Sequence, residues 1–385
     1  MTNGALGGIK VIDFSHARAG PQCTQLLGDM GADVIKIEKT TGDGSRHWGP
    51  AYKGERIDFL SLNRNKQGLA VDLTDAQQLS QVKELVAQAD VVIQNFRPGV
   101  MAKFGLDAET LLEQQPDLVY CTISGYGSTG PLAKERSYDQ VIQGFSGFMS
   151  VTGTEEAGPV RAGIPIADLL GGVFSALGIC AALREREVSG RGQHVETSLL
   201  QGLVSLMSFH AQDYLLTGNV PGVAGNHHPI IAPTGTFRAA DGALTVAVAN
   251  DSMWQRMCES MGRPELATDP RFVTNNDRLQ HRDELIEEIE AALSRRSKHE
   301  WVVAFTEAGV PSGPVHTVGE ALDHEQVRAN GLVVSTEHST VGPMEMLGFP
   351  VQLSRTPLSV RMPPPSLGEH NRDHGLPEPE KGSQS

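Results

Sequence analysis

Strand-like and helix-like segments alternate through the first half of the chain, and this order constrains the fold more than any other feature. Short apolar runs predict strands at 9–15, 33–38, 90–96, 117–125 and 192–198, and amphipathic patterns predict helices at 20–31, 74–89, 107–115 and 199–216. Strands that alternate with helices usually form one parallel sheet with helices on both faces. We therefore predict an α/β protein with a central parallel sheet.

A change in composition marks a second domain. Residues 217–235 are dense in glycine and proline, which is typical of a linker or a ligand-binding loop. A hairpin turned at Asp241 and Gly242 follows, and then helical patterns near 252–261, 277–293 and 298–308. We predict a smaller α+β domain at 224–330, flanked by a large domain built from 1–223 and 331–385, and we expect the polar, proline-rich end to be disordered.

Charge and cysteine content argue against several functions. The chain has 32 basic and 46 acidic side chains among 385 residues, a net charge of −14, which disfavours a nucleic-acid or membrane-surface role. The four cysteines form no CxxC pair, so we expect no disulfide framework, no zinc site and a reducing, cytoplasmic compartment. The histidines show no metal-binding spacing, and neither a signal peptide nor a membrane span is expected.

One carboxylate stands at the start of a long apolar segment. Asp168 precedes the run Leu169 to Leu183, which predicts a buried helix, with Pro165 as a breaker upstream. An aspartate here caps a helix well, because its side chain accepts hydrogen bonds from unpaired N–H groups of the first turn. Beside Gly171 and Gly172 it is also an anion close to bare backbone, which suits a nucleophile. The local pattern leaves both roles open.

Charged and polar residues follow two of the predicted strands. They are Glu38, Lys39, Asp43 and Arg46 in one loop, and Asn95, Arg97 and Lys103 in another. Parallel sheets bind ligands at the carboxyl ends of their strands, so these basic residues favour an anionic ligand with phosphates. The alternative is a pair of solvated charged loops. His227 and His228 lie in a segment that is either a ligand loop or a surface turn.

Residues 125–130 match the GxGxxG pattern of dinucleotide-binding loops. However, Pro131 follows at once, no amphipathic helix opens on these glycines, and the match is far from the first strand–helix turn. We interpret the segment as an active-site or structural loop rather than a nicotinamide-cofactor site.

A set of segments, in order along nearly the whole chain, resembles one known family. They are VIDFSHARAGPQCTQLLGDMGADVIKIEKTTGDGSR, NRNKQGLAVDL, ADVVIQNFRPGVMAKFGL, SGYGSTGP, SYDQVIQGFSG, AGIPIADLLGG, SGRGQHVETSLL, GVPSGPV and LGEH. They are similar to segments of the class III CoA-transferases, the family of formyl-CoA transferase and carnitine CoA-transferase. The resemblance implies a Rossmann-like large domain, a small domain, an interlocked homodimer, and acyl-CoA and carboxylic acids as substrates, with no tightly bound cofactor and no metal.

The resemblance also implies roles for individual residues. Asp168 matches the family nucleophile, which attacks the donor thioester to give an aspartyl anhydride and then an aspartyl-CoA thioester; N–H groups at the helix N-terminus are candidates for stabilising the oxyanion. Coenzyme A contacts are implied for His16, Ala17, Arg18, Lys39, Val71, Asp72, Leu73, Thr74, Asn95, Phe96, Arg97, Lys103, Arg136, Ser137, Tyr138 and Asp139. Thr74 stands where some relatives carry lysine.

The sequence therefore predicts an enzyme that moves CoA from an acyl-CoA donor, succinyl-CoA, to a small carboxylic acid. The segment GNHHPIIAPTGTF is similar to one in relatives that use dicarboxylates such as itaconate, citramalate, malate, mesaconate or glutarate. A second carboxylate needs its own partner, for which the candidates are His16, Arg46, His227 and His228.

Two alternative functions are a 2-methylacyl-CoA racemase of the same fold and a nucleotide-binding oxidoreductase that uses residues 125–130. Related racemases carry a histidine at the position of Tyr138. A phenol ordinarily has a pKa of about 10 and is poorly matched to shuttling protons near neutral pH, which argues against a racemase.

Overall fold

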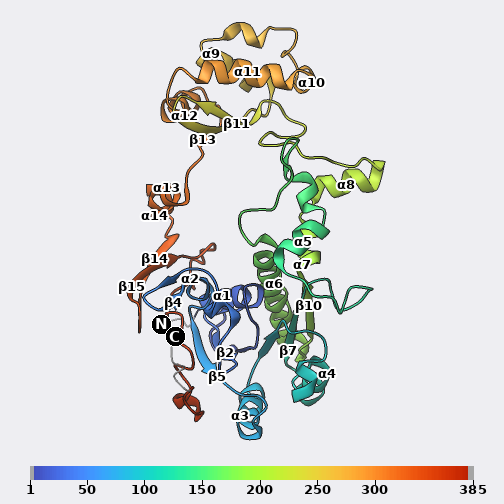
Figure 1. Ribbon diagram of the computed structural model, residues 1–385, viewed down its shortest axis with the longest axis vertical. Coiled ribbons are helices and arrows are strands. Elements are labelled where there is room, and N and C mark those ends of the chain that lie inside the picture. Colours follow the sequence, from blue (N-terminus) through green and yellow to red (C-terminus); the bar gives the residue numbers. More distant parts are fainter. Residues whose placement is uncertain (1–3, 380–385) are drawn as a thin grey trace. The chain divides into compact units, whose positions relative to one another are not determined.

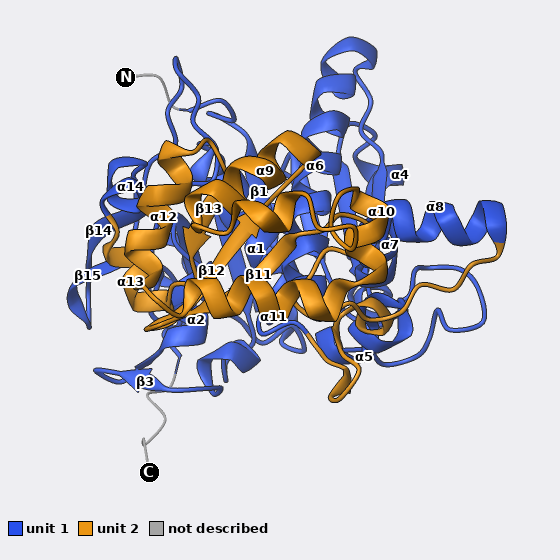
Figure 2. Cartoon of the chain, turned by 90° about the horizontal axis from the view of Figure 1, so that it is seen from above, with its two compact units in different colours: residues 1–148, 162–217, 325–385 blue, residues 149–161, 218–324 orange. Residues whose placement is uncertain are grey.

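The computed structural model describes residues 4–379, which form two compact units (Figure 2). Unit 2 consists of Met149–Arg161 and Gly218–His324, and unit 1 contains the rest. The second domain expected at 224–330 differs from unit 2 at both ends and lacks 149–161. That segment forms the hairpin of β8 (Gly153–Thr154) and β9 (Gly158–Pro159). The N–H of Gly225 donates a hydrogen bond to the carbonyl oxygen of Gly153 and so links the hairpin to the rest of unit 2. No local sequence pattern predicts this contact.

Unit 1 is built on a six-stranded parallel sheet (Figure 1). Its strands are β1 (Lys10–Asp13), β2 (Asp33–Glu38), β5 (Lys66–Ala70), β6 (Val91–Gln94), β7 (Val119–Ser124) and β10 (His194–Ser198). They pair in the order β10-β7-β6-β1-β2-β5, so the chain runs outward from β1 on one side and outward from β6 on the other. The loops that leave β1 and β6 therefore diverge, and this is where doubly wound sheets bind ligands.

Helices cover both faces of this sheet, as the sequence predicts. The helices of unit 1 are α1 (Ala19–Asp29), α2 (Ile57–Leu62), α3 (Ala76–Val86), α4 (Ala108–Gln114), α5 (Asp139–Phe145), α6 (Ile166–Ser189), α7 (Leu199–Ser205), α8 (Ser208–Thr217) and α14 (Glu325–Ala329), and α1 and α6 cover one face of the sheet while α3 and α4 cover the other. Two short hairpins complete the unit, β3 (Ala51–Tyr52) with β4 (Glu55–Arg56) and β14 (Val333–His338) with β15 (Gly342–Leu347).

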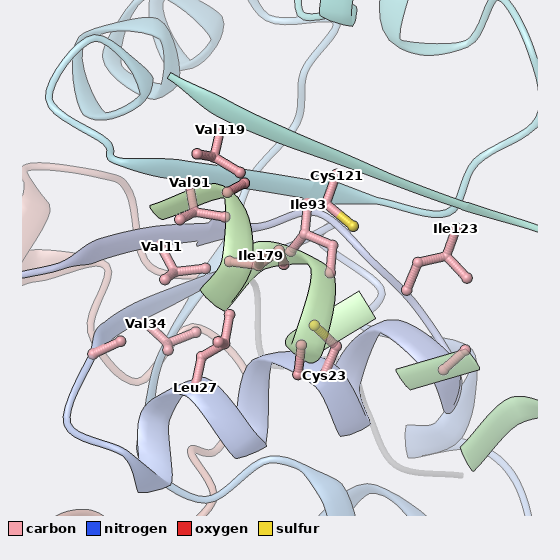
Figure 3. Packing of buried hydrophobic residues seen from close by; sticks show 14 of the residues in the cluster. Val11, Cys23, Leu27, Val34, Val91, Ile93, Val119, Cys121, Ile123 and Ile179 are labelled. Carbon is pink, nitrogen blue, oxygen red and sulfur yellow. The ribbon is translucent and has the colours of Figure 1, made fainter. Parts of the chain in front are cut away.

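Alternate residues of each strand belong to different cores because successive side chains point to opposite faces of a sheet. Val11, Val91, Ile93 and Cys121 pack with α1 and α6, including Leu27 and Ile179 (Figure 3). Their neighbours in the strands, Ile12, Val92 and Tyr120, pack with α3 and α4 on the other side. Because both faces are covered, the site can form only at an edge or at the strand ends.

Helices α1 and α6 approach each other closely at glycines. A Cβ atom on Gly172 would lie 2.6 Å from the carbonyl oxygen of Ala19, and a Cβ on Gly171 would lie 2.7 Å from Cδ2 of Leu199. Gly172 is one turn beyond Asp168, so the two share one face of α6. The contact therefore places Asp168 beside the start of α1.

Several predicted boundaries differ in the structure. Helix α6 starts at Ile166, so Asp168 is the third residue of its first turn and not its N-cap. The helix expected at 199–216 is two helices, separated at Ser208, where φ is 44°. The hairpin turns at Ala240 and Asp241, because Gly242 already pairs with Ala239.

Unit 2 has its own core and a small antiparallel sheet. Its strands are β11 (Thr234–Ala239), β12 (Gly242–Ala247) and β13 (Ser312–Pro314), and its helices are α9 (Asp251–Ser260), α10 (Asn275–Gln280), α11 (Arg282–Leu293), α12 (Lys298–Glu307) and α13 (Val318–Asp323). Phe237, Trp254, Ile289 and Trp301 are among the residues that fill its core.

Within residues 4–379, α6 is the one helix whose length and composition would allow it to cross a membrane. Its residues Ala167, Ser175, Ala176 and Ile179 are buried against α1 and the sheet. Packing in the core therefore accounts for the apolar residues on this face of the helix.

The glycine contact yields a stability prediction. In an open helix Gly→Ala stabilises by about 1 kcal/mol. Gly172→Ala meets the backbone oxygen of Ala19 instead, so overpacking should reverse the sign and destabilise the protein by about 1–3 kcal/mol in urea unfolding. Gly319→Ala in α13 is the matched control, since a Cβ there would have no neighbouring atom within 4 Å. Equal stability of Gly172→Ala and wild type would contradict the close contact.

Candidate active site

A cavity of about 800 Å³ opens at the carboxyl ends of the unit 1 strands. Every strand of the sheet contributes lining residues: Phe14 and His16–Ala19 after β1, Ile37–Thr40 at the end of β2, Val71–Thr74 after β5, Asn95–Pro98 after β6, Ile123–Tyr126 at the end of β7, and Leu199 after β10. The volume lies within the range of about 300–1,000 Å³ typical of small-molecule sites. This is the position expected of a ligand site in a doubly wound sheet.

The loops after β1 and β6 are joined at the point where the strand order reverses. The backbone N–H of His16 donates to Oδ1 of Asn95 at 2.9 Å, and Nδ2 of Asn95 donates to the carbonyl oxygen of His16 at 2.9 Å. The His16 ring packs edge-on against Phe96, with centroids 4.3 Å apart. Burial, with the nearby charge of Lys36, lowers the pKa of His16, so its imidazole is neutral near pH 7.

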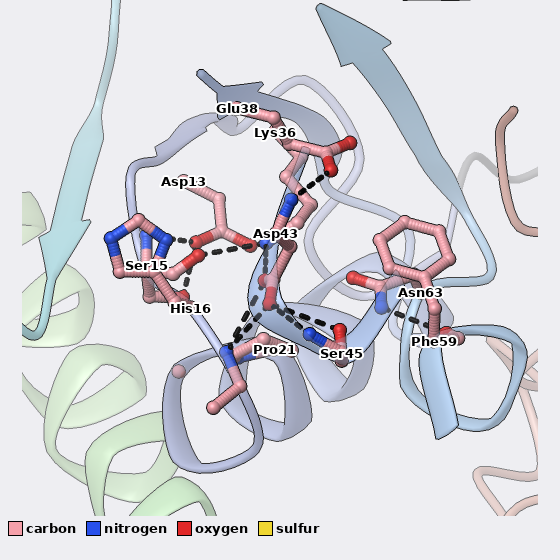
Figure 4. A network of polar contacts seen from close by, with 12 residues as sticks. Asp13, Ser15, His16, Pro21, Lys36, Glu38, Asp43, Ser45, Phe59 and Asn63 are labelled. Carbon is pink, nitrogen blue, oxygen red and sulfur yellow. Dashed lines mark hydrogen bonds and ion pairs between the residues drawn. The ribbon is translucent and has the colours of Figure 1, made fainter. Parts of the chain in front are cut away.

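A buried ion pair between Lys36 and Asp43 supports the loop after β1 that contains Ala17 (Figure 4). Ala17 has a φ of 61°, a conformation that costs a residue with a Cβ about 1–2 kcal/mol. Its N–H donates to both carboxylate oxygens of Asp43, at 3.1 and 3.2 Å. Lys36 Nζ lies 3.0 Å from Asp43, and both side chains are fully buried. Burial alone would raise the pKa of Asp43, but Lys36 and the N–H groups of Ser45 and Ala17 hold it well below its usual range.

Asp168 lines the cavity, and a second aspartate caps its helix. The Oδ1 atom of Asp139 accepts hydrogen bonds from the N–H groups of Ala167, at 2.8 Å, and of Asp168, at 3.2 Å. The N–H of Leu169 donates to the carbonyl oxygen of Pro165. These first-turn donors therefore have protein acceptors, and the expectation that they stabilise an oxyanion is wrong for these three groups.

The surroundings of Asp168 disfavour its charge. Burial raises the pKa of Asp168 most, and the like charge of Asp139, with a smaller contribution from Asp58, raises it further. Arg18 opposes these effects, and the resulting pKa is about 7. Asp139 also occupies N–H groups that would otherwise stabilise an anion at the start of the helix. A cavity carboxyl group whose pKa is raised to the working pH is a candidate functional group.

The structure gathers most of the predicted coenzyme A contacts around this cavity. The lining includes His16, Ala17, Arg18, Lys39, Val71, Asp72, Leu73, Thr74, Asn95, Phe96, Arg97, Arg136, Ser137 and Tyr138. Lys103 is exposed and does not line it. Asp139 lies behind it as the cap of α6.

The four candidates for binding a distal carboxylate are placed differently. His16 lines the cavity. Arg46 does not, because its guanidinium forms a two-pronged ion pair with Glu38, at 2.7 and 2.8 Å, and lies over the Phe59 ring. His227 and His228 belong to unit 2, where they line a small pocket with Arg282, and their proposed role stays a prediction.

Sequence patterns missed Trp48 and Asp58 beside the cavity. Trp48 lines it, and Asp58 holds Arg18 in an ion pair of 3.1 Å. Trp48 lies beyond Arg46 in the loop after β2, and Asp58 lies in the short helix α2. Neither belongs to a recognisable local motif, so no local signal identifies them. Gly125 and Tyr126 also line the cavity, and the next helix starts only at Asp139, as expected of an active-site loop and not of a dinucleotide fingerprint.

The arrangement suits chemistry by a carboxylate. Asp168 is partly desolvated, which leaves its ionised oxygen more reactive than in water. Within residues 4–379 no group of three histidine, cysteine, aspartate or glutamate side chains is placed to hold a metal ion. The cavity lining includes the carboxyl group of Asp168 and the guanidinium of Arg18.

Known proteins are similar to this chain in sequence and in fold. Residues 6–371 match the family model described as CoA-transferase family III. The chain is 39% identical to a succinate–glutarate CoA-transferase of Agrobacterium fabrum, over 95% of this chain and 93% of the relative, and 37% identical to a succinyl-CoA–D-citramalate CoA-transferase of Chloroflexus aurantiacus, over 96% and 92%. The crystal structure of a CAIB/BAIF family protein from Brucella suis superposes with a TM-score of 0.89 at 35% identity, covering 97% and 98% of the two chains.

The pKa of Asp168 is directly measurable. We expect its carboxyl band in an infrared pH titration to disappear with a midpoint near pH 7, with Asp168→Asn identifying the band. Asp139→Asn keeps an acceptor oxygen for α6 but removes the like charge, so the midpoint should move to lower pH. A wild-type midpoint near the ordinary value of 3.8 would contradict the raised pKa.

Proposed function

Because the chain belongs to CoA-transferase family III, we propose that it transfers coenzyme A from succinyl-CoA to a small dicarboxylate, with Asp168 as the nucleophile. The observation that carries the proposal is the partly buried carboxylate of Asp168 in a cavity formed by the carboxyl ends of all six strands. The relatives named for glutarate and citramalate support the choice of acid and donor.

The reaction needs no water and no cofactor. An ionised oxygen of Asp168 attacks the thioester carbonyl of succinyl-CoA, the C–S bond breaks, and the products are a mixed anhydride and CoA thiolate. The thiolate attacks the carbonyl carbon of the Asp168 side chain, which releases succinate and leaves an aspartyl-CoA thioester. The acceptor carboxylate attacks this thioester, giving a new anhydride and thiolate, and the thiolate then takes the acyl group and frees Asp168.

The residues around Asp168 assist this sequence in distinct ways. Burial removes part of the hydration shell that makes a carboxylate a weak nucleophile in water, an effect named but contested in enzymology. Asp139 fixes the first turn of α6 and so the position of the attacking oxygen. The loop at Ala17, held by Asp43, forms the adjoining wall. Near pH 7 a substantial fraction of Asp168 is ionised and able to attack.

The racemase alternative gains no support from the cavity. Tyr138, which stands where related racemases carry histidine, lines the cavity with an exposed side chain. The oxidoreductase alternative rested on residues 125–130, whose structural context differs from a dinucleotide fingerprint.

A homodimer, interlocked as the family resemblance implies, is part of the proposal. Unit 1 exposes large apolar side chains on α6 and α8, including Leu177 (64% exposed), Leu215 (74%) and Leu216 (76%). Apolar surface of this kind on one unit is typical of an interface. A second copy of the chain is the proposed partner, and sedimentation equilibrium of the purified protein measures it directly.

Asp168→Asn tests the nucleophile. An amide cannot form the acyl anhydride, so transfer from succinyl-CoA to glutarate should fall by several orders of magnitude. The variant should still fold. The pKa of Asp168 is raised from 3.8 to about 7, so its charge opposes folding above about pH 7, and this cost vanishes below about pH 4. In urea, the variant should therefore be more stable than wild type at about pH 8, with the difference shrinking toward acid pH.

Retained transfer in Asp168→Asn would overturn the assignment. The control is the reverse exchange, of an amide for an acid, at Gln201. The side-chain oxygen of Gln201 accepts a hydrogen bond from the Ser198 hydroxyl, and Gln201 is distant from Asp168 along the chain. Gln201→Glu should retain transfer within about threefold.

A further inference from the structure

We propose that Arg18 binds the distal carboxylate of the dicarboxylate while the other carboxylate reacts at Asp168. This inference rests on the proposed function and names the residue that selects its acid. A carboxylate in a partly closed cavity needs a cationic or hydrogen-bonding partner, because an unpaired buried charge is costly.

Four basic side chains line the cavity, and they divide into two groups. Lys39, Arg97 and Arg136 are exposed, in loops after β2 and β6 and before α5. Arg18 is half-buried, with 30% of its side chain exposed. Coenzyme A carries its phosphates at one end and its thiol at the other. Exposed cations are therefore suited to the phosphates, and a half-buried cation beside the nucleophile meets the acyl group.

Two observations place Arg18 beside Asp168. Arg18 directly precedes Ala19, whose carbonyl oxygen packs on Gly172, one turn along the α6 face that carries Asp168. The charge of Arg18 also lowers the pKa of Asp168. The two side chains therefore face the same part of the cavity.

The guanidinium of Arg18 is held but still has donors to offer. Its Nη2 atom lies 3.1 Å from Oδ1 of Asp58, and its Cζ atom lies 5.6 Å from the centre of the Trp48 ring. Among residues 4–379, Nε and Nη1 have no hydrogen-bond partner. Asp58 and Trp48 orient the planar group, and the remaining donors match the geometry of a carboxylate.

Competing candidates are less suited to this role. Arg46 is committed to Glu38 and does not line the cavity. His16 has a lowered pKa because of burial and Lys36, so it supplies a neutral ring near pH 7. Arg18 therefore replaces Arg46 as the cation expected to select a diacid.

The test compares two acids of equal length, glutarate and pentanoate, with succinyl-CoA as donor. In wild type kcat/KM should favour glutarate. Arg18→Gln removes the charge and should lower kcat/KM for glutarate on the order of 10- to 100-fold, with a change of less than about threefold for pentanoate. Arg18→Lys keeps the positive charge but loses the two-pronged geometry of the guanidinium, and it should recover part of the preference for glutarate over pentanoate.

Lys39→Gln is the matched control, because it also removes a cavity cation. It should raise the KM for succinyl-CoA and leave the glutarate-to-pentanoate ratio unchanged. An unchanged ratio in Arg18→Gln, or an equal loss with both acids, overturns the role of Arg18 alone. If wild type transfers CoA to neither glutarate nor any other diacid, the proposed function itself fails and the inference falls with it.

Discussion

The close contact of α1 with α6 at Gly172 is the constraint on which the site depends. Because no side chain separates Gly172 from Ala19, the N-terminal ends of two helices from distant parts of the chain come together. One end carries Asp168 and the other carries the loop His16–Arg18. Both helices are fixed in turn by packing on the same face of the sheet, through residues such as Leu27 and Ile179. Asp168 and Arg18 thus owe their proximity to the packing of the core.

A second layer of polar contacts sets the chemistry within that frame. The buried pair of Lys36 and Asp43 holds Ala17 in an unfavourable backbone conformation, which aims the loop into the cavity. Asp139 affects Asp168 in two ways: it caps helix α6 in place of Asp168, and its charge raises the pKa of Asp168. Stability and reactivity are opposed here, since a carboxylate that is partly desolvated and near another acid is costly to ionise.

Sequence patterns predict the sheet and the location of the site because strand runs and strand-end loops are local features. These patterns do not predict strand β5 or helix α2. Strand β5 carries Lys66, a charged residue whose burial depends on partners of its ammonium group such as Asp13 and Asn63. They do not predict the cap of α6 either, since Asp139 reaches Asp168 across 29 residues of sequence. The sequence pattern does not predict that Arg46 pairs with Glu38, because the folded loop is what brings the two side chains together. A local pattern cannot supply these polar contacts, because the folded chain alone brings the partners together.

The proposed mechanism requires that Asp168 become covalently acylated, and the acylated intermediate can be trapped. The protein is incubated with succinyl-CoA, treated with hydroxylamine, which attacks anhydrides and thioesters, and digested for mass spectrometry. A hydroxamate should form on the peptide that contains Asp168, and it should depend on succinyl-CoA and be absent in Asp168→Asn. An enzyme that transfers CoA while this peptide stays unmodified, or that carries the label on another residue, would contradict the proposed mechanism.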